Sequence, residues 1–268
     1  MLDIEFGQAT HPGKVRTNNE DCAGFYRPRS PQEARSRGWL FVLADGVGGL
    51  DMGEVASAKT IQVISEGFAE SPENTSLLSL LPRLIQHANA AVHDESFARE
   101  RRGRLMASTV VACALRHDQA IVAHVGDSRC YLVRDGAAVA LTRDHTLAAE
   151  QHRLGLVSAE EAAESEARGV LARSLGPERF VTADTNAVTL RAGDRLVLCS
   201  DGVFSGIEDA DIARIVSGGK PIEVLAQDLV DCSVAQDGSD NATAQVVAIR
   251  SVEALSLYRG RYYPRPGA

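Results

Sequence analysis

Residues 109–142 read TVVACALRHDQAIVAHVGDSRCYLVRDGAAVALT and contain two successive β-hairpin patterns. Apolar runs rich in Val, Ile, Leu and Ala are separated by short polar connections, His117-Asp118 in the first pair and Asp135-Gly136 in the second. Asp-Gly between two apolar runs is a strong signal for a type I′ turn, so successive hairpins and antiparallel sheet are predicted. The four strands are expected at Thr109–Leu115, Gln119–Val125, Cys130–Arg134 and Ala138–Thr142.

The rest of the chain adds strands and helices that do not alternate strictly. Several apolar runs are continuous, as expected of strands buried on both faces, and other segments repeat apolar residues at helical spacing. This order indicates the α+β class, with antiparallel sheets and helices packed outside them. Further strands are expected at Trp39–Ala44, Asp194–Ser200 and Ala244–Arg250, and helices at Glu54–Glu70, Leu77–Arg101, Ala148–Gly155, Asp209–Ser217 and Ile222–Ala235.

The length allows one large domain or two small ones, and a chain of this size can bury a substantial core without staples. No internal repeat or low-complexity tract is evident, and we expect one domain at residues 1–253. Residues 147–180 are polar, rich in Glu and Ala and helix-prone, which suggests a flap inserted between strands. Residues 254–268 end in a basic, Pro- and Gly-interrupted run and are expected to form a C-terminal tail.

The composition argues against several classes of protein. The formal charge of −8, from 36 acidic and 28 basic residues, argues against a nucleic-acid partner or an anionic membrane surface. Five scattered cysteines without a C-x-x-C spacing indicate a reducing compartment. The N-terminus lacks the pattern of a signal peptide, and no apolar stretch approaches the roughly 18–20 residues that span a bilayer. We therefore expect a cytoplasmic protein.

Aspartates recur where apolar runs begin or end. Packed strand ends can bring such carboxylates together, and clustered carboxylates repel one another unless a cation lies among them. An all-oxygen set without His or Cys suits Mg²⁺ or Mn²⁺ and not zinc. Taken singly, an Asp-Gly pair is more often a turn. The aspartates concerned are Asp45 after LFVLA, Asp127 after IVAHVG, Asp201 after RLVLCS and Asp240 before a strand.

A second polar cluster lies at residues 15–21, VRTNNED. Here Arg16 stands close to the acidic pair Glu20 and Asp21, which would place a bidentate phosphate donor beside a cation ligand. On its own, such a stretch is more often a polar loop.

Seven motifs then occur in one order between residues 15 and 247: VRTNNED, ADGVGGLDMGEVAS, MASTVV, AHVGDSRCYLVRDG, LTRDH, RLVLCSDGVF and SDNATAQVV. With this set the chain resembles the PPM family of metal-dependent, type 2C serine/threonine phosphatases, particularly its compact bacterial members. The resemblance covers nearly the whole chain except the tail. It implies a central antiparallel β-sandwich flanked by helices on both sides, a four-layer αββα arrangement.

The resemblance also implies two core metal ions, Mn²⁺ or Mg²⁺. Asp45 would bridge them, Asp21 and the Gly46 carbonyl would bind one, and Asp201 and Asp240 would complete the other. A water between two such ions is acidified and can attack phosphorus in line.

Supporting roles follow from the same resemblance. Asp127, together with Asp201, would hold a third and weaker ion, and Arg16 would bind the substrate phosphate. Glu20 and Asn241 would support the metal ligands from behind. The implied substrates are proteins carrying phosphoserine or phosphothreonine, and the implied opposing partner is a serine/threonine kinase. We expect a monomer, as is common for this fold.

The chain departs from the family pattern at Leu50, where many relatives carry a histidine thought to protonate the leaving group. Asp51 is our candidate for that general acid, with a metal-bound water or a handicapped enzyme as alternatives. A pseudophosphatase that binds phosphoproteins without turnover is the competing hypothesis, and the retained aspartates and Arg16 argue against it. An unrelated two-metal hydrolase is disfavoured by the ordered motifs. His145 in LTRDHT is expected to be structural.

Overall fold

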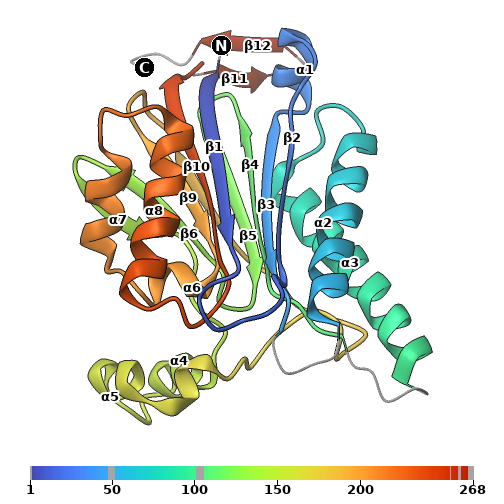
Figure 1. Ribbon diagram of the computed structural model, residues 1–268. Helices are drawn as coiled ribbons and strands as arrows, with labels where there is room; N and C mark the ends of the chain where they lie inside the picture. Colours follow the sequence, from blue (N-terminus) through green and yellow to red (C-terminus); the bar gives the residue numbers. More distant parts are fainter. Residues whose placement is uncertain (1, 48–51, 101–105, 254, 259–260, 265–268) are drawn as a thin grey trace.

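Two five-stranded antiparallel sheets stack face to face in the computed structural model, which describes residues 2–47, 52–100, 106–253, 255–258 and 261–264 (Figure 1). One sheet has the order β1 (Asp3–His11), β10 (Ala242–Ser251), β9 (Arg195–Cys199), β6 (Arg129–Arg134), β7 (Ala137–Ala140). The other has the order β2 (Asp21–Tyr26), β3 (Trp39–Asp45), β4 (Val110–Arg116), β5 (Gln119–Val125), β8 (Asp184–Thr189).

Helices cover the outer face of each sheet (Figure 1). Apolar side chains such as Phe41, Val111 and Leu198 fill the space between the sheets, and two further clusters lie between each sheet and its helices. The four-layer αββα arrangement of the α+β class is thereby confirmed. α2 (Gly53–Glu70) and α3 (Leu77–Glu100) cover the β2–β8 sheet, and α6 (Asp201–Phe204), α7 (Asp209–Val216) and α8 (Ile222–Gln236) cover the other.

Both hairpins predicted from residues 109–142 form, but they belong to different sheets. β4 pairs with β5 across His117 and Asp118, and β6 pairs with β7 across Asp135 and Gly136. Asp135 and Gly136 have φ values of 53° and 79°, and a type I′ turn requires positive φ at both positions. The short segment Gly126–Ser128 therefore carries the chain from one sheet to the other, with Asp127 at its centre.

Three strands of the two five-stranded sheets and three short helices were not predicted from the sequence, nor were the two strands of the C-terminal segment. β8 reads DTNAVT and is mostly exposed at the edge of its sheet, so its pattern resembles that of a polar loop. β2 reads DCAGFY and is only partly buried, while β1 alternates buried and exposed residues over a mixed sequence. The short helices are α1 (Pro31–Ser36), α5 (Ala159–Glu164) and α6.

The segment expected as a flap begins with α4 (Leu147–Arg153), α5 and a 3₁₀ turn at Glu166–Gly169. These elements lie beneath one end of the sandwich (Figure 1). The segment expected as a tail contains β11 (Leu255–Tyr258) and β12 (Arg261–Pro264), which pair antiparallel. No helix in the described part of the chain is long and apolar enough to cross a membrane.

Candidate active site

Strand pairing brings the aspartates together at one end of the sandwich. Asp21 opens β2 and Asp45 closes β3, and the two are direct partners in the antiparallel register. Side chains at such positions share a face of the sheet with Cβ atoms about 4.5–5.5 Å apart. In the other sheet the end of β9 lies beside the start of β10, which brings Asp201 and Asp240 to the same end.

A cavity of about 470 Å³ opens at this end of the molecule. The carboxylates of Asp45, Asp127, Asp201 and Asp240 line it together with Arg16. Flap residues of the 169–171 stretch form part of its wall. Most of the sequence-predicted residues thus meet in one acidic pocket beneath the strand ends, whereas Asp21 lies beside Asp45 without lining the cavity, and Glu20 and Asn241 do not line it either.

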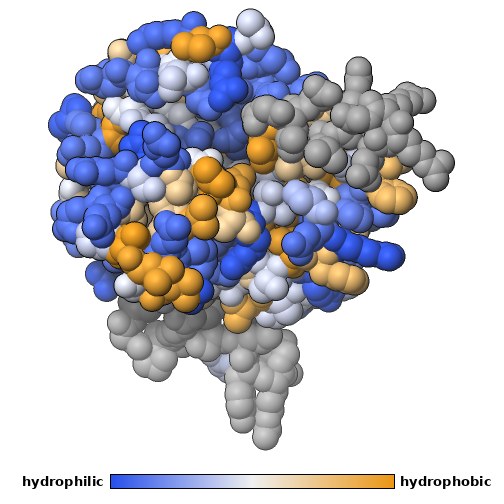
Figure 2. Space-filling model, turned by 90° about the horizontal axis from the view of Figure 1, so that it is seen from below, coloured by the Kyte–Doolittle hydropathy of each residue, from blue (hydrophilic) through white to orange (hydrophobic). Residues whose placement is uncertain are grey.

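A neighbouring cavity of about 560 Å³ shares Asp127 and Asp201 with this pocket. It lies between the flap helices and α6, and alanines of α4 and α5 line much of it. Figure 2 views the molecule from this end and shows hydrophobic patches set among hydrophilic surface. Exposed apolar side chains of residues 147–180 include Leu147, Leu154, Leu156, Val170 and Phe180.

The carboxylates of the pocket destabilise one another's ionised forms. Burial, followed by the charges of neighbouring aspartates, raises the pKa of Asp45 well above its usual range. Burial raises the pKa of Asp21 to about 7, although its hydrogen bonds with Thr243 and Ser200 act in the opposite direction. Burial, followed by the charge of Asp201, raises the pKa of Asp127 to about 7. The cluster therefore favours either bound protons or a bound cation.

One oxygen of Asp21 provides a direct test of whether a cation fits. Its Oδ2 accepts a hydrogen bond of 2.7 Å from Ser200 Oγ, whereas its Oδ1 is buried and has no hydrogen-bond partner in the described part of the chain. An orphaned buried carboxylate oxygen is costly unless something compensates it. The all-oxygen donor set of this pocket suits Mn²⁺ or Mg²⁺, so the residues present fit such an ion.

Arg16 lies at the mouth of the pocket with its side chain 42% exposed. Its NH2 group donates a hydrogen bond of 2.7 Å to Asp240 Oδ2. The guanidinium implied as the phosphate donor is thus paired with one of the implied metal ligands.

Asn241 fastens the loop that carries Arg16 to the start of β10. Its Oδ1 accepts from the Glu20 amide at 2.8 Å, and its Nδ2 donates to the carbonyls of Pro12 and Asn18 at 2.9 Å each. The Glu20 carbonyl in turn accepts from the Gly46 amide at 3.1 Å. Glu20 and Asn241 therefore connect the N-terminal loop to both sheets directly behind the aspartates.

Gly46 follows Asp45 at a point where two backbones touch. A Cβ at Gly46 would meet the backbone of Gly53 at 2.3 Å, so the start of α2 can approach the end of β3 only at a glycine. The Leu50 and Asp51 positions lie outside the described residues, so the general-acid hypothesis has no geometry to support it.

Two residues of the site, Ser200 and Thr109, were not predicted from the sequence to belong to it. Ser200 holds Asp21, and Thr109 accepts from the Asp45 amide through its Oγ1 at 3.1 Å. Both lie inside motifs noted above, RLVLCSDGVF and MASTVV, and their nearness to the motif aspartates was the available signal.

An αββα sandwich with an acidic, all-oxygen pocket and an arginine beside it has the groups that a metal-dependent phosphatase requires. The family model described as protein phosphatase 2C matches residues 30–234, and the chain belongs to that family. The serine/threonine phosphatase stp of Listeria innocua is 31% identical over 246 residues, covering 89% of this chain and 93% of the relative. This chain is accordingly a metal-dependent protein serine/threonine phosphatase.

Solved structures agree. The serine/threonine phosphatase of S. agalactiae superposes with a TM-score of 0.81 at 30% identity, covering 92% of this chain and 100% of the other. The catalytic domain of the serine/threonine protein phosphatase PstP, solved in complex with 2 manganese ions, superposes with a TM-score of 0.77 at 29% identity, covering 94% of this chain and 100% of that domain. The relatives named here are phosphatases, and none supports the pseudophosphatase hypothesis.

Proposed function

We propose that the acidic pocket is where phosphoserine and phosphothreonine of proteins are hydrolysed, and that its aspartates hold Mn²⁺ or Mg²⁺. In this proposal Asp45 would contribute to holding both of two ions, with Asp21 and the Gly46 carbonyl as further ligands of one and Asp201 and Asp240 as further ligands of the other. The observation that carries the proposal is the orphaned Asp21 Oδ1 atom beside its direct strand partner Asp45. When bound, the ions supply an acidified water and positive charge beside the phosphoryl oxygens.

A third and weaker ion is proposed between Asp127 and Asp201. Its support is the 7% exposure of Asp127 and the mutual charge repulsion of these two side chains. A hard cation between them would offset that repulsion.

We assign phosphate binding to Arg16. Its guanidinium is half-exposed and can exchange Asp240 for the two oxygens of a phosphoryl group, a geometry that arginine fits bidentately. Asn241 and Glu20 keep the Arg16 loop in reach of the pocket through the hydrogen bonds described above.

The experiment that tests this function compares hydrolysis of p-nitrophenyl phosphate and of a phosphothreonine peptide with Mn²⁺, with Mg²⁺ and with chelator. We expect metal-dependent turnover of both substrates, and a loss of about 10³-fold in Asp45→Asn because several kcal/mol of transition-state stabilisation are removed. Asp135→Asn is the matched control, since it makes the same change in an exposed turn where Asn tolerates positive φ. Full activity of Asp45→Asn would refute the proposed site.

Asp51 remains our proposal for the general acid. A seryl or threonyl leaving group needs protonation far more than a phenolate does, and such help is worth about 10²–10⁴-fold. Asp51→Asn should therefore slow phosphopeptide turnover while p-nitrophenyl phosphate turnover changes little. Equal turnover of the phosphopeptide by wild type and variant would exclude Asp51 from this role.

We further propose that the enzyme opposes a serine/threonine kinase and acts as a cytoplasmic monomer. All five cysteines are free thiols, which fits a reducing compartment. Light scattering of the purified protein tests the monomer, and phosphoproteome changes on deletion test for kinase substrates.

A further inference from the structure

A buried histidine, His145, connects segments that lie far apart in the sequence. It is 1% exposed and contacts the crossover between the sheets through two reciprocal hydrogen bonds. The Gly126 amide donates to His145 Nδ1 at 3.1 Å, and the His145 amide donates to the Gly126 carbonyl at 3.1 Å. The amide and the carbonyl of Gly126, the residue before Asp127, are thus both hydrogen-bonded to His145, the amide to its side chain and the carbonyl to its backbone.

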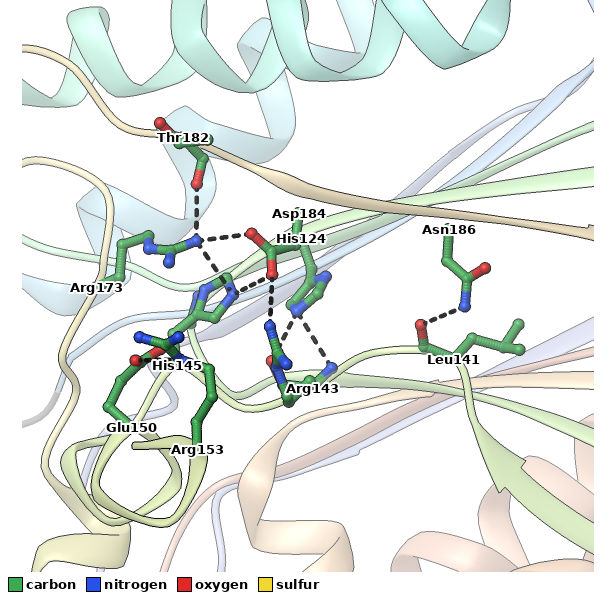
Figure 3. A network of polar contacts seen from close by, with 11 residues as sticks. His124, Leu141, Arg143, His145, Glu150, Arg153, Arg173, Thr182, Asp184 and Asn186 are labelled. Atoms are coloured by element: carbon green, nitrogen blue, oxygen red, sulfur yellow. Dashed lines mark hydrogen bonds and ion pairs between the residues drawn. The ribbon is translucent and has the colours of Figure 1, made fainter. Parts of the chain in front are cut away.

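The other side of the imidazole faces β8 and the flap (Figure 3). His145 Nε2 lies 3.3 Å from Asp184 Oδ2. Arg173, on the return segment of the flap, donates to Asp184 Oδ1 at 2.9 Å and to the Thr182 carbonyl at 3.0 Å. The ring of His124 stacks on that of His145 with centroids 4.6 Å apart.

These contacts fix the tautomer of His145. Because Nδ1 accepts from the Gly126 amide, we assign the ring proton to Nε2, which lies 3.3 Å from Asp184 Oδ2. Arg173 Nη1 lies 3.2 Å from the same ring nitrogen, and its protons go to the Asp184 carboxylate and the Thr182 carbonyl. Burial, followed by the neighbouring His124 and Arg173, lowers the pKa of His145 to about 4. The imidazole is therefore neutral at pH 7 and can keep accepting from Gly126.

The same group superficially resembles a metal site. Ligand atoms of His124, His145 and Asp184 all lie within 4.8 Å of one another. However, both ring nitrogens of His145 are already engaged, and the guanidinium groups of Arg143 and Arg173 lie against Asp184 at 3.6 and 2.9 Å. A cation here would meet two fixed positive charges, so this cluster is a scaffold.

Thr109 packs against the crossover segment Gly126–Ser128 as well. A Cβ on Gly126, whose φ is +101°, would meet Thr109 Cβ at 2.6 Å. Thr109 Oγ1 also contacts Ser128 Oγ at 2.7 Å and accepts from the Asp45 amide. The backbone that carries Asp127 is therefore held between Thr109 and His145.

His145 also holds the flap through its backbone. The Ala172 amide donates to the His145 carbonyl at 2.8 Å, and Thr146 forms a β-bridge with Leu171. Leu171 lines the acidic pocket. One residue thus connects the flap wall of the pocket to the crossover that bears Asp127.

We propose that His145 is a positioning residue that orients Asp127 for its cation and couples the flap to that site. The proposal rests on the function proposed above, in which Asp127 and Asp201 bind the weaker ion. Its neutral imidazole acts through the Gly126 amide and touches neither substrate nor metal. Groups that orient metal ligands are typically worth about 10–100-fold in metal affinity or activity.

The test titrates Mn²⁺ into the full-length protein by calorimetry, comparing wild type with His145→Gln and His145→Asn. Asn places an acceptor oxygen near the Nδ1 position, whereas Gln mimics only Nε2. We expect His145→Gln to weaken the weaker Mn²⁺ site about 10-fold with the tighter binding unchanged, and His145→Asn to restore most of that affinity. A role limited to global stability would lower the melting temperature of both variants without separating the two classes of site.

Asp127→Asn, measured in parallel, separates this inference from the proposed function. If Asp127→Asn removes the weaker site and His145→Gln leaves it unchanged, the positioning role of His145 is wrong while the metal assignment stands. If Asp127→Asn has no effect on Mn²⁺ binding, the positioning role of His145 and the assignment of the weaker site to Asp127 are both wrong. Should His145→Gln fail to fold, ¹⁵N NMR of the wild-type protein decides: the Nε2–H tautomer supports the role, and a Nδ1–H tautomer overturns it.

Discussion

The acidic pocket and the His145 network, which consists of His124, Arg143, His145, Arg173 and Asp184, both gather ionisable side chains at the same end of the sandwich. Their charges are balanced differently. In the network, Asp184 is matched by Arg143, Arg173 and a neutral imidazole. In the pocket, the aspartates are opposed only by the half-exposed Arg16 among the described side chains that line it. The comparison teaches that a balanced cluster stabilises the fold, whereas an unbalanced one is poised for a cation.

The pH dependence of stability should separate the two regions most strongly. The pKa of Asp21 and of Asp127 is raised to about 7 from 3.8, so in chelator the folded protein binds more protons than the unfolded chain between these values. The free energy of unfolding should then fall as pH rises from 4 to 7, by up to about 1.4 kcal/mol per pH unit for each such group. Chemical denaturation across this range checks the slope.

Saturating Mn²⁺ should remove this fall, because a bound cation keeps the carboxylates ionised at every pH of the series. A slope that is the same with Mn²⁺ and with chelator would mean that the pocket does not bind the ion through these aspartates.

Removing Ser200 should show how much the pocket depends on a neutral side chain that hydrogen-bonds Asp21. Ser200 Oγ donates to Asp21 and accepts from the Thr243 amide at 3.0 Å, so Ser200→Ala removes one hydrogen bond from each group. We expect a loss of about 1–3 kcal/mol in chelator. The loss should be smaller with Mn²⁺, which would still hold Asp21. Thermal or urea unfolding under both conditions measures it, and an identical loss under both would count against a cation on Asp21.

Removing the charge of Asp184 from the His145 network should reduce the stability of the fold less, and by an amount that does not depend on the metal. Asp184 is partly exposed, and asparagine has nearly the same shape as aspartate. We therefore expect Asp184→Asn to lower the free energy of unfolding by about 1 kcal/mol. This loss should be the same in chelator and in Mn²⁺, as measured by urea unfolding. A loss that is larger in Mn²⁺ would show that Asp184 contributes to cation binding, either directly or through His145.

The sequence predicted those parts of the molecule that depend on local signals. The Asp135-Gly136 turn and the apolar runs around it established antiparallel sheet, and the aspartates at strand ends indicated a common pocket. β8 was not predicted, because an exposed edge strand has no apolar pattern. Its first residue, Asp184, nevertheless contacts His145 in the network.

Long-range partners could not be predicted. The pairing of Arg16 with Asp240 joins residues 224 positions apart, and the bond between Gly126 and His145 depends on how the crossover packs. His145 was expected to be structural, and its sequence context LTRDHT shows neither Gly126 nor Asp184 as a partner.

The most direct measurement of the central claim is the melting temperature of wild type, Asp45→Asn and Asp135→Asn, each in chelator and in Mn²⁺. A ligand that binds only the folded state at 100 times its dissociation constant stabilises by about 2.7 kcal/mol. We predict that Mn²⁺ raises the melting temperature of wild type and of Asp135→Asn, and that Asp45→Asn loses most of this rise. An equal rise in all three proteins would contradict the assignment of the acidic pocket as the metal centre.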